Sequence, residues 1–189
     1  MQRWREAVWH AIPQDAEPER FGVRLAFLLA HVRTGQRVLD LGCGDGRFAT
    51  ELAAAGAQVV GADVAAEAVR RARARGVEAV VVPEDGALPF AEDAFELVWA
   101  GEVLEHVADV VGLLAEVRRV LRWGSTLLVT TPWHGRLVVA PDAHFDPRSD
   151  HLRFFSARTL RAVLRDAGFA DVEVRASGRP PRGLHAVAR

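Results

Sequence analysis

The sequence predicts an α/β fold, in which strand-like and helix-like segments alternate along the chain. The main sign is an apolar, strand-type run at 38–41 that breaks into glycines at 42, 44 and 46 and continues as a helical pattern. Further apolar runs of strand length, separated by helical patterns, lie at 57–63, 77–82 and 95–100. A strand that turns into a helix through glycines is a common way to bind a nucleotide-like ligand. The turn is therefore the first candidate site.

The length and composition of the chain predict a single globular domain. The chain has 189 residues, half of them hydrophobic, which is enough for a buried core. The amino end has no secretion-signal layout and no apolar run approaches bilayer-spanning length, so we expect a soluble cytoplasmic protein without a membrane span. The single cysteine, Cys43, fits a reducing compartment, and its position favours a packed small residue over a reactive thiol.

The charge pattern argues against a nucleic-acid partner. The 24 basic and 25 acidic residues nearly cancel, although the carboxy-terminal third is basic. No basic run is interleaved with aromatic side chains, as a groove for a nucleic-acid strand would require.

Residues 1–34 are expected to form a helical cap ahead of the first strand. Trp4, Val8 and Trp9 have helical spacing, and a second amphipathic helix is predicted from Phe21 to Val32. Helices in this position cover the edge of a sheet or the mouth of its site. We expect the tryptophans to be packing residues, with a substrate lid as the alternative.

The spacing of the glycine turn separates two classes of ligand. A dinucleotide fingerprint needs G-x-G-x-x-G, and its third glycine would fall at Arg47. The string D-L-G-C-G-D-G at 40–46 instead resembles the first motif of class I S-adenosylmethionine-dependent methyltransferases. Their cofactor has a cationic ammonium and no pyrophosphate, so acids in the loop are suitable partners. A structural glycine-rich turn is the alternative.

Asp63 ends the second apolar run, about 20 residues beyond the first glycine. An acid in this place can accept both ribose hydroxyls of a nucleoside in charge-assisted hydrogen bonds. The alternative is an N-cap for a helix predicted over 65–75.

The third strand ends in P-E-D-G at 83–86, followed by A-L-P-F at 87–90. This segment is similar to the G-D-A-x-x-L-P-F pattern of the ubiquinone/menaquinone-biosynthesis (type 11) methyltransferase group. In that pattern an acid accepts from the adenine amino group and the next backbone N–H donates to the ring. Glu84 stands where the usual aspartate would be, with Asp85 as its competitor; an exposed acidic turn is the alternative.

The fourth strand leads into E-V-L-E-H-V at 102–107, a string typical of the same group and placed where the acceptor should meet the sulfonium. On a helical turn, Glu102, Glu105 and His106 would share one face. Completed by His151 or His144, they could hold a divalent metal, as a similar E-x-x-E-H arrangement does in small-RNA 2′-O-methyltransferases. Without a metal, His106 or His151 could act as a general base. Structural capping and hydrogen bonding remain a third interpretation. We assign His106 and His151 as catalytic residues and no metal ligand.

The last third of the chain is expected to complete the sheet and cover the site. Asp109 is placed to cap a helix over 110–122 that Gly124 ends, and a strand is predicted over 125–131. The long loop at 132–155 is rich in histidine and aromatic residues, which predicts a substrate lid. Ser156 then caps a helix over 157–167, and two strands are predicted near 172–175 and 185–188.

The resemblance covers the chain from about Arg37 to the end, because its motifs occur in order, including D-A-G-F at 166–169. It implies a single domain (1–189) with a Rossmann-like three-layer α/β/α sandwich, whose seven-stranded, mostly parallel sheet has an antiparallel last strand. It also implies the cofactor S-adenosyl-L-methionine. The predicted cofactor-binding residues are Asp40, Gly42, Cys43, Gly44, Asp45, Gly46, Asp63, Val64, Glu84, Asp85, Gly86 and Ala100.

The resemblance implies methyl transfer to a small-molecule acceptor by direct in-line displacement, for which the enzyme supplies proximity and alignment. We expect a monomer or homodimer. Two alternatives remain: a metal-assisted or nucleic-acid methyltransferase, and a non-catalytic S-adenosylmethionine-binding module.

Overall fold

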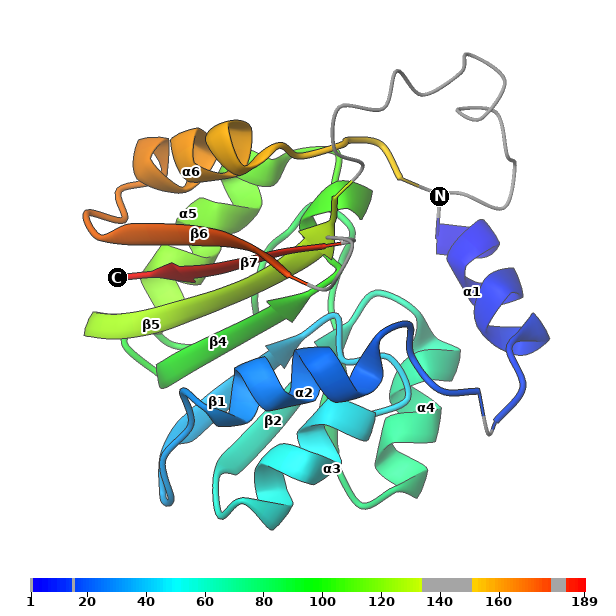
Figure 1. Ribbon diagram of the computed structural model, residues 1–189. Coiled ribbons are helices and arrows are strands. Elements are labelled where there is room, and N and C mark those ends of the chain that lie inside the picture. Colours follow the sequence, from blue (N-terminus) through cyan, green and yellow to red (C-terminus); the bar gives the residue numbers. More distant parts are fainter. Residues whose placement is uncertain (1, 15, 134–150, 178–182) are drawn as a thin grey trace.

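The computed structural model of the chain describes residues 2–14, 16–133, 151–177 and 183–189. These residues form a seven-stranded sheet in the order β3-β2-β1-β4-β5-β7-β6 (Figure 1). The strands are β1 (Arg37–Leu41), β2 (Gln58–Asp63), β3 (Glu78–Val81), β4 (Phe95–Gly101), β5 (Leu121–Pro132), β6 (Val172–Ser177) and β7 (Gly183–Ala188). Only the last strand, β7, runs antiparallel to its neighbours in this sheet. The predicted Rossmann-like sheet is therefore confirmed.

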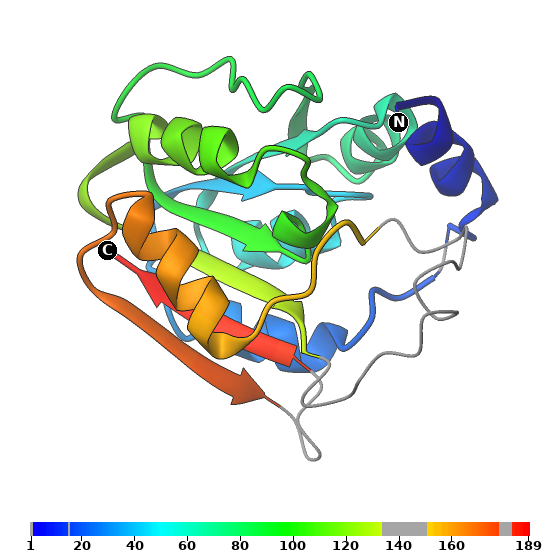
Figure 2. The ribbon, with the colours of Figure 1, turned by 90° about the horizontal axis from the view of Figure 1, so that it is seen from above.

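Helices cover both faces of the sheet. One face carries α2, α3 and α4, the other carries α5 and α6, and α1 lies beyond the sheet beside α4 (Figures 1 and 2). The helices are α1 (Gln2–Ala11), α2 (Phe21–Leu29), α3 (Arg47–Ala54), α4 (Ala66–Ala74), α5 (Val110–Val120) and α6 (Ala157–Asp166), with a short 3₁₀ turn, η1 (Leu104–His106).

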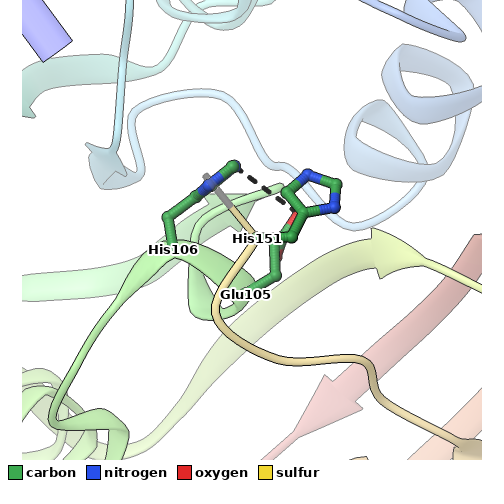
Figure 3. A group of neighbouring side chains, drawn as sticks. All are labelled: Glu105, His106 and His151. Carbon is green, nitrogen blue, oxygen red and sulfur yellow. Dashed lines mark ion pairs between the residues drawn. The ribbon is translucent and has the colours of Figure 1, made fainter. Parts of the chain in front are cut away.

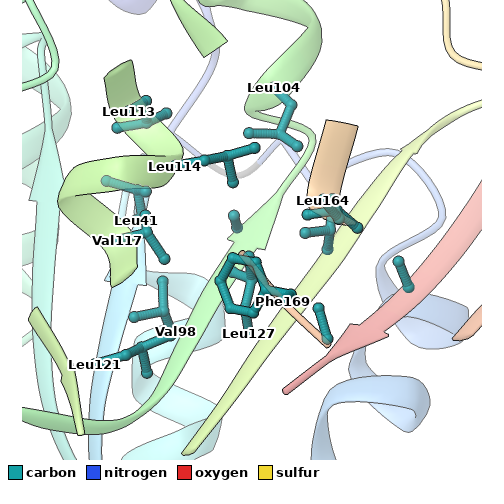
Figure 4. Packing of buried hydrophobic residues seen from close by; sticks show 14 of the residues in the cluster. Leu41, Val98, Leu104, Leu113, Leu114, Val117, Leu121, Leu127, Leu164 and Phe169 are labelled. Atoms are coloured by element: carbon teal, nitrogen blue, oxygen red, sulfur yellow. The ribbon is translucent and has the colours of Figure 1, made fainter. Parts of the chain in front are cut away.

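The core divides into two layers because side chains alternate across each strand. On β1, Val38 packs with α2 and α3, whereas Leu39 faces the opposite cluster under α5 and α6. Leu114, Leu127 and Phe169 belong to that second cluster and are completely or almost completely buried (Figure 4). Burying each such side chain contributes about 1.5–3 kcal/mol. The two apolar layers hold β1 and β4 at the centre, where the sheet changes the direction of its strand order.

The predicted boundary between α5 and β5 was wrong. The helix ends at Val120 rather than Arg122, because Leu121 has an extended backbone (φ −79°, ψ 131°) and pairs with Phe95 of β4. The strand therefore starts at Leu121, and Gly124 lies inside it.

Both predicted helix caps are confirmed. The Asp109 side chain accepts a hydrogen bond from the Gly112 N–H at 2.9 Å. Ser156 forms a capping box with Thr159 at the start of α6. Within the described ranges, no helix has both the length and the apolar character needed to cross a bilayer.

Candidate functional site

The glycine turn after β1 has the backbone geometry expected from its sequence. Gly42, Gly44 and Gly46 all have positive φ, at 71°, 54° and 82°. A Cβ on Gly42 would lie 2.5 Å from Cγ2 of Val103, and a Cβ on Gly44 would lie 2.8 Å from the Trp9 ring. These positions therefore require glycine both for the backbone angle and for the close approach of neighbouring elements.

A cavity of about 530 Å³ opens at the carboxyl ends of β1 to β4, which is the expected place for a ligand in this kind of sheet. Its volume lies within the range of about 300–1,000 Å³ that small-molecule sites occupy. The loops after these four strands line the cavity, and residues of α1 line it as well. The lining includes Arg5, Val8, Trp9, Ile12, Gly42, Asp63, Val64, Glu84, Asp85, Gly86, Glu102, Val103 and His106.

Asp63 lies at the end of β2, lines the cavity and is 9% exposed. Its Oδ2 accepts from the Gly44 N–H at 3.0 Å and its Oδ1 from the Ala65 N–H at 2.9 Å. Burial raises the pKa of the carboxyl, and these two N–H donors oppose the rise. Each oxygen keeps a second lone pair. The carboxylate is thus fixed against the glycine turn with capacity to accept from a ligand.

Asp63 does not cap α4 directly. The N-cap residue of α4 is Ala65, and the first N–H groups of the helix are satisfied from α1: Glu6 accepts from the N–H groups of Ala66 and Glu67. This contact fastens α1 over the cavity.

The loop after β3 contributes Glu84, Asp85 and Gly86 to the cavity lining. One Glu84 oxygen lies 4.0 Å from Nε of Arg5, so this carboxylate already faces a cation. Oδ1 of Asp85 accepts from the Ala87 N–H at 3.0 Å. Both acids predicted for this segment therefore border the same space.

Six of the twelve predicted cofactor-binding residues do not line the cavity: Asp40, Cys43, Gly44, Asp45, Gly46 and Ala100. Asp45 pairs instead with Arg47 at 3.1 Å and Arg75 at 2.8 Å. Cys43 is 5% exposed, its sulfur packs against Gly61, and burial raises the pKa of its thiol. Cys43 therefore has the surroundings of a packing residue.

Asp40 lies behind the glycine turn and is 1% exposed. Burial raises the pKa of its carboxyl to about 7, and the charge of Arg24 opposes the rise. Among the described residues its Oδ2 has no hydrogen-bond partner. This buried carboxyl therefore has capacity for a proton or for one further hydrogen bond.

Arg24 is a buried cation that contacts the cavity residue Glu102 and that the sequence interpretation did not single out. It is buried on α2, donates from Nε to the Thr130 hydroxyl at 3.2 Å, and lies 3.9 Å from Oε1 of Glu102. Its guanidinium lies over the Phe48 ring, 4.7 Å from the centroid. Position 24 falls on the apolar face defined by Phe21 and Leu28, which indicates that the side chain is buried but does not reveal its partners.

The predicted shared face of Glu102, Glu105 and His106 was wrong. Glu102 has φ 59°, a left-handed conformation, so it lies outside the 3₁₀ turn that contains the other two. Its side chain is held toward Arg24 instead.

Glu105 and His106 meet His151, which comes from the segment before α6 (Figure 3). One ligand atom of each of the three residues lies within 4.8 Å of those of the other two. The Glu105 carboxyl is 1% exposed, and its pKa is raised to about 7 by burial and by the charge of Glu102. The structure therefore places His106 and His151, the two residues predicted as catalytic, beside the buried Glu105.

Part of the predicted substrate lid lies outside the described residues. This applies to 134–150, which includes His144, the other predicted fourth metal ligand. Trp133 packs against the main core cluster.

Sequence comparison finds relatives with known family assignments. The sequence model of a family described as "Methyltransferase domain" matches residues 9–174. The chain is 34% identical over 140 residues to a probable S-adenosylmethionine-dependent methyltransferase of Mycobacterium tuberculosis, covering 74% of this chain and 50% of that protein. It is 37% identical over 117 residues to the ubiquinone biosynthesis O-methyltransferase of Xanthomonas oryzae pv. oryzae, covering 58% and 48%. The chain thus spans about half the length of these curated relatives.

Solved structures share the fold. A putative methyltransferase of Haloferax volcanii, in complex with the Trm112 methyltransferase activator, has a TM-score of 0.73 at 24% identity, covering 87% of this chain and 88% of that chain. Phosphoethanolamine N-methyltransferase 2 of Haemonchus contortus, in complex with S-adenosyl-L-methionine, has a TM-score of 0.77 at 23% identity, covering 87% and 40%. With the family match over most of its length, the chain belongs to the methyltransferase domain family.

Proposed function

We propose that this chain is an S-adenosylmethionine-dependent methyltransferase that acts on a small-molecule acceptor. The observation that carries the proposal is the cavity in which the glycine turn and Asp63 meet at the carboxyl ends of β1 and β2. The names of the relatives from M. tuberculosis and X. oryzae support the cofactor, and the second supports a small acceptor.

In this proposal the cofactor lies along the carboxyl edge of the sheet. Asp63 accepts from the ribose hydroxyls, and the acids of the loop after β3 accept from the adenine amino group while the Gly86 region borders the ring. The methionine part lies over Gly42. Residues behind the turn, such as Asp40 and Gly46, shape it without direct contact.

The reaction is an in-line displacement. A nucleophilic atom of the acceptor attacks the methyl carbon, the carbon–sulfur bond breaks, and S-adenosylhomocysteine leaves. His106 lines the cavity. The His151 ring packs against the His106 ring, with ring centroids 4.8 Å apart. These imidazoles stand beside the acceptor in the proposed complex, where they receive its proton if the nucleophile is a hydroxyl.

The testing experiment combines cofactor binding with turnover. We expect Asp63→Ala to weaken S-adenosylmethionine binding by about 2 kcal/mol, because a charge-assisted pair with the ribose is lost. Transfer of a labelled methyl group to a panel of hydroxyl, amine and carbon acceptors measures activity. An unchanged dissociation constant in Asp63→Ala would remove the ribose assignment. Binding without transfer to any acceptor would favour the non-catalytic cofactor-binding module.

A further inference from the structure

Glu105, His106 and His151 form a compact group of potential metal ligands, here called the Glu-His-His cluster, and its member His106 lines the cavity. Glu105 and His106 come from η1, which follows β4, and His151 comes from the segment that precedes α6 (Figure 3). The distance between Oε1 of Glu105 and Nε2 of His106 is 4.0 Å. Segments far apart in the sequence thus bring one carboxylate and two imidazoles together.

Glu105 is the member that points to a missing ligand. Its side chain is 1% exposed, and neither carboxylate oxygen has a hydrogen-bond partner among the described residues. His106 Nε2 faces this carboxyl at 4.0 Å, which is beyond hydrogen-bond distance. Burying a carboxylate that lacks a hydrogen-bond donor is costly, and a bound cation would offset that cost. A solvated surface acid would give no such indication.

Backbone contacts fix the two halves of the cluster. The Leu152 N–H donates to the Glu105 carbonyl at 2.7 Å. The next residue, Arg153, donates to the carbonyl oxygens of Val107 and Ala108. His151 is therefore held beside Glu105 by its own neighbours in the chain, and the ligand set is preorganised by the fold.

We propose that the Glu-His-His cluster binds one divalent transition-metal cation of the zinc type. Two imidazole nitrogens and one carboxylate oxygen suit zinc, cobalt and nickel, whereas magnesium and calcium prefer oxygen ligands throughout. Bond lengths of about 2.0–2.2 Å require the ligand atoms to draw together by a small rotation of their side chains.

Glu102 is not part of this ligand set. Its left-handed backbone turns it away from η1, and its carboxylate lies 3.9 Å from Arg24. The metal-site alternative from the sequence, which counted Glu102 as a ligand, is therefore replaced by a three-residue set.

The cation would restrict the acceptor to compounds with an oxygen nucleophile, an inference that rests on the proposed function. Three protein ligands leave a coordination position for substrate. Because His106 also lines the cavity, a ligand in that position would lie at the cavity wall. An acceptor hydroxyl in that position would give its proton to solvent, and its oxygen would form the bond to the methyl carbon as the carbon–sulfur bond breaks. Both imidazoles then act as ligands rather than as bases.

Cobalt binding tests the cluster independently of methyl transfer. The untagged chain, stripped of metal with a chelator, is titrated with Co²⁺ and followed by visible absorption. We expect one Co²⁺ per chain, with the absorption bands of a nitrogen and oxygen site. Glu105→Gln and His151→Asn should each lower the affinity on the order of 100-fold.

Two control variants separate this site from adventitious binding. His10→Asn changes an exposed histidine of α1, and Glu102→Gln changes the nearest acid outside the ligand set. His10→Asn should bind Co²⁺ with wild-type affinity. Glu102→Gln removes a charge that acts on Glu105, so it should change the Co²⁺ affinity much less than Glu105→Gln while keeping one Co²⁺ per chain. Thermal melting of each metal-free variant verifies that it is folded, and His151→Asn serves if Glu105→Gln does not fold.

The inference is overturned if the wild-type chain binds no Co²⁺, or if Glu105→Gln and His151→Asn bind it as tightly as wild type. Calorimetry with S-adenosylhomocysteine on the metal-free chain distinguishes the two proposals. Heat from that nucleoside without cobalt binding removes only the metal site. Cobalt binding without nucleoside binding removes only the proposed methyltransferase cofactor site.

Discussion

At the level of single residues, Asp40 shows how burial controls a proton in this site. Its carboxyl has a pKa of about 7, because it is removed from water, against about 4 in an unfolded chain. Between these values the folded chain holds a proton that the unfolded chain releases. The stabilisation that this proton contributes should therefore decrease as pH rises through this window. Above pH 7 that contribution should be completely lost.

Asp40→Asn tests this dependence, because the amide cannot ionise. Between pH 4 and 8 the wild-type chain should lose on the order of 4 kcal/mol more unfolding free energy than the variant. Denaturant unfolding at several pH values measures the difference. Asp171→Asn, which changes an exposed acid paired with Arg189, is the control and should keep the wild-type slope. Parallel curves for wild type and Asp40→Asn would contradict the assignment.

Gly42→Ala tests whether the turn needs glycine for contact as well as for conformation. The new Cβ would meet Val103 at 2.5 Å in a backbone with φ 71°. We expect a loss of stability above the roughly 1–2 kcal/mol of left-handed strain alone, together with weaker cofactor binding. Thermal melting and calorimetric titration measure the two effects.

Gly76→Ala is the matched control, since Gly76 has φ 84° and a Cβ added there would have no neighbouring atom within 4 Å. It should show the strain alone and bind the cofactor normally. Equal behaviour of the two variants would mean that the Val103 contact has no role.

The sequence predicted the residues whose role depends on local position, and missed those that depend on distant partners. Asp63 is the last residue of β2 and Gly42 directly follows β1, so strand prediction places both at the cavity. Arg24 contacts Glu102 and Thr130, which lie about 80 and 106 residues away, and no local pattern reveals such a partner. Glu102 was misplaced because its positive φ is rare for a residue other than glycine.

At the level of elements, α1 is held over the cavity by contacts with the start of α4 and with η1. Glu6 accepts from two N–H groups at the start of α4, and Nη2 of Arg5 donates to the His106 carbonyl at 2.6 Å. Because Arg5, Val8 and Trp9 line the cavity, the position of this helix affects what the cavity can hold.

Glu6→Ala should loosen α1 without changing the sheet. We expect a stability loss of about 1 kcal/mol, typical of a lost helix cap, and faster release of S-adenosylhomocysteine. Stopped-flow dissociation and thermal melting provide the measurements. Glu17→Ala, at an exposed acid after α1, should leave both unchanged. An unaltered release rate in Glu6→Ala would show that α1 does not cover the bound nucleoside.

Element types were predictable where periodicity was strong, and boundaries were less so. The buried stripe of α5 and its Asp109 cap predicted the start of that helix correctly. Its end was placed two residues late, because Leu121 continues the apolar helical pattern while its backbone pairs with Phe95. Pairing with a distant strand decided this boundary, and the helical pattern could not show it.

At the level of the whole molecule, the order of the strands explains why one edge carries the chemistry. β1 pairs with β2 on one side and β4 on the other, so the loops after these strands diverge and leave a space between them. The sequence predicted this part of the sheet because each of the first four strands ends in, or is followed by, a recognisable motif. The meeting of His151 with Glu105 depends on the path of the chain after β5, and the histidine-rich segment could only suggest it.

The central claim is that this edge binds S-adenosylmethionine. Calorimetric titration of the wild-type chain with S-adenosylhomocysteine, beside a parallel titration with a nicotinamide dinucleotide, tests it most directly. The account predicts saturable binding of one S-adenosylhomocysteine per chain and no binding of the dinucleotide. Absence of heat with S-adenosylhomocysteine, together with saturable binding of the dinucleotide, would contradict it.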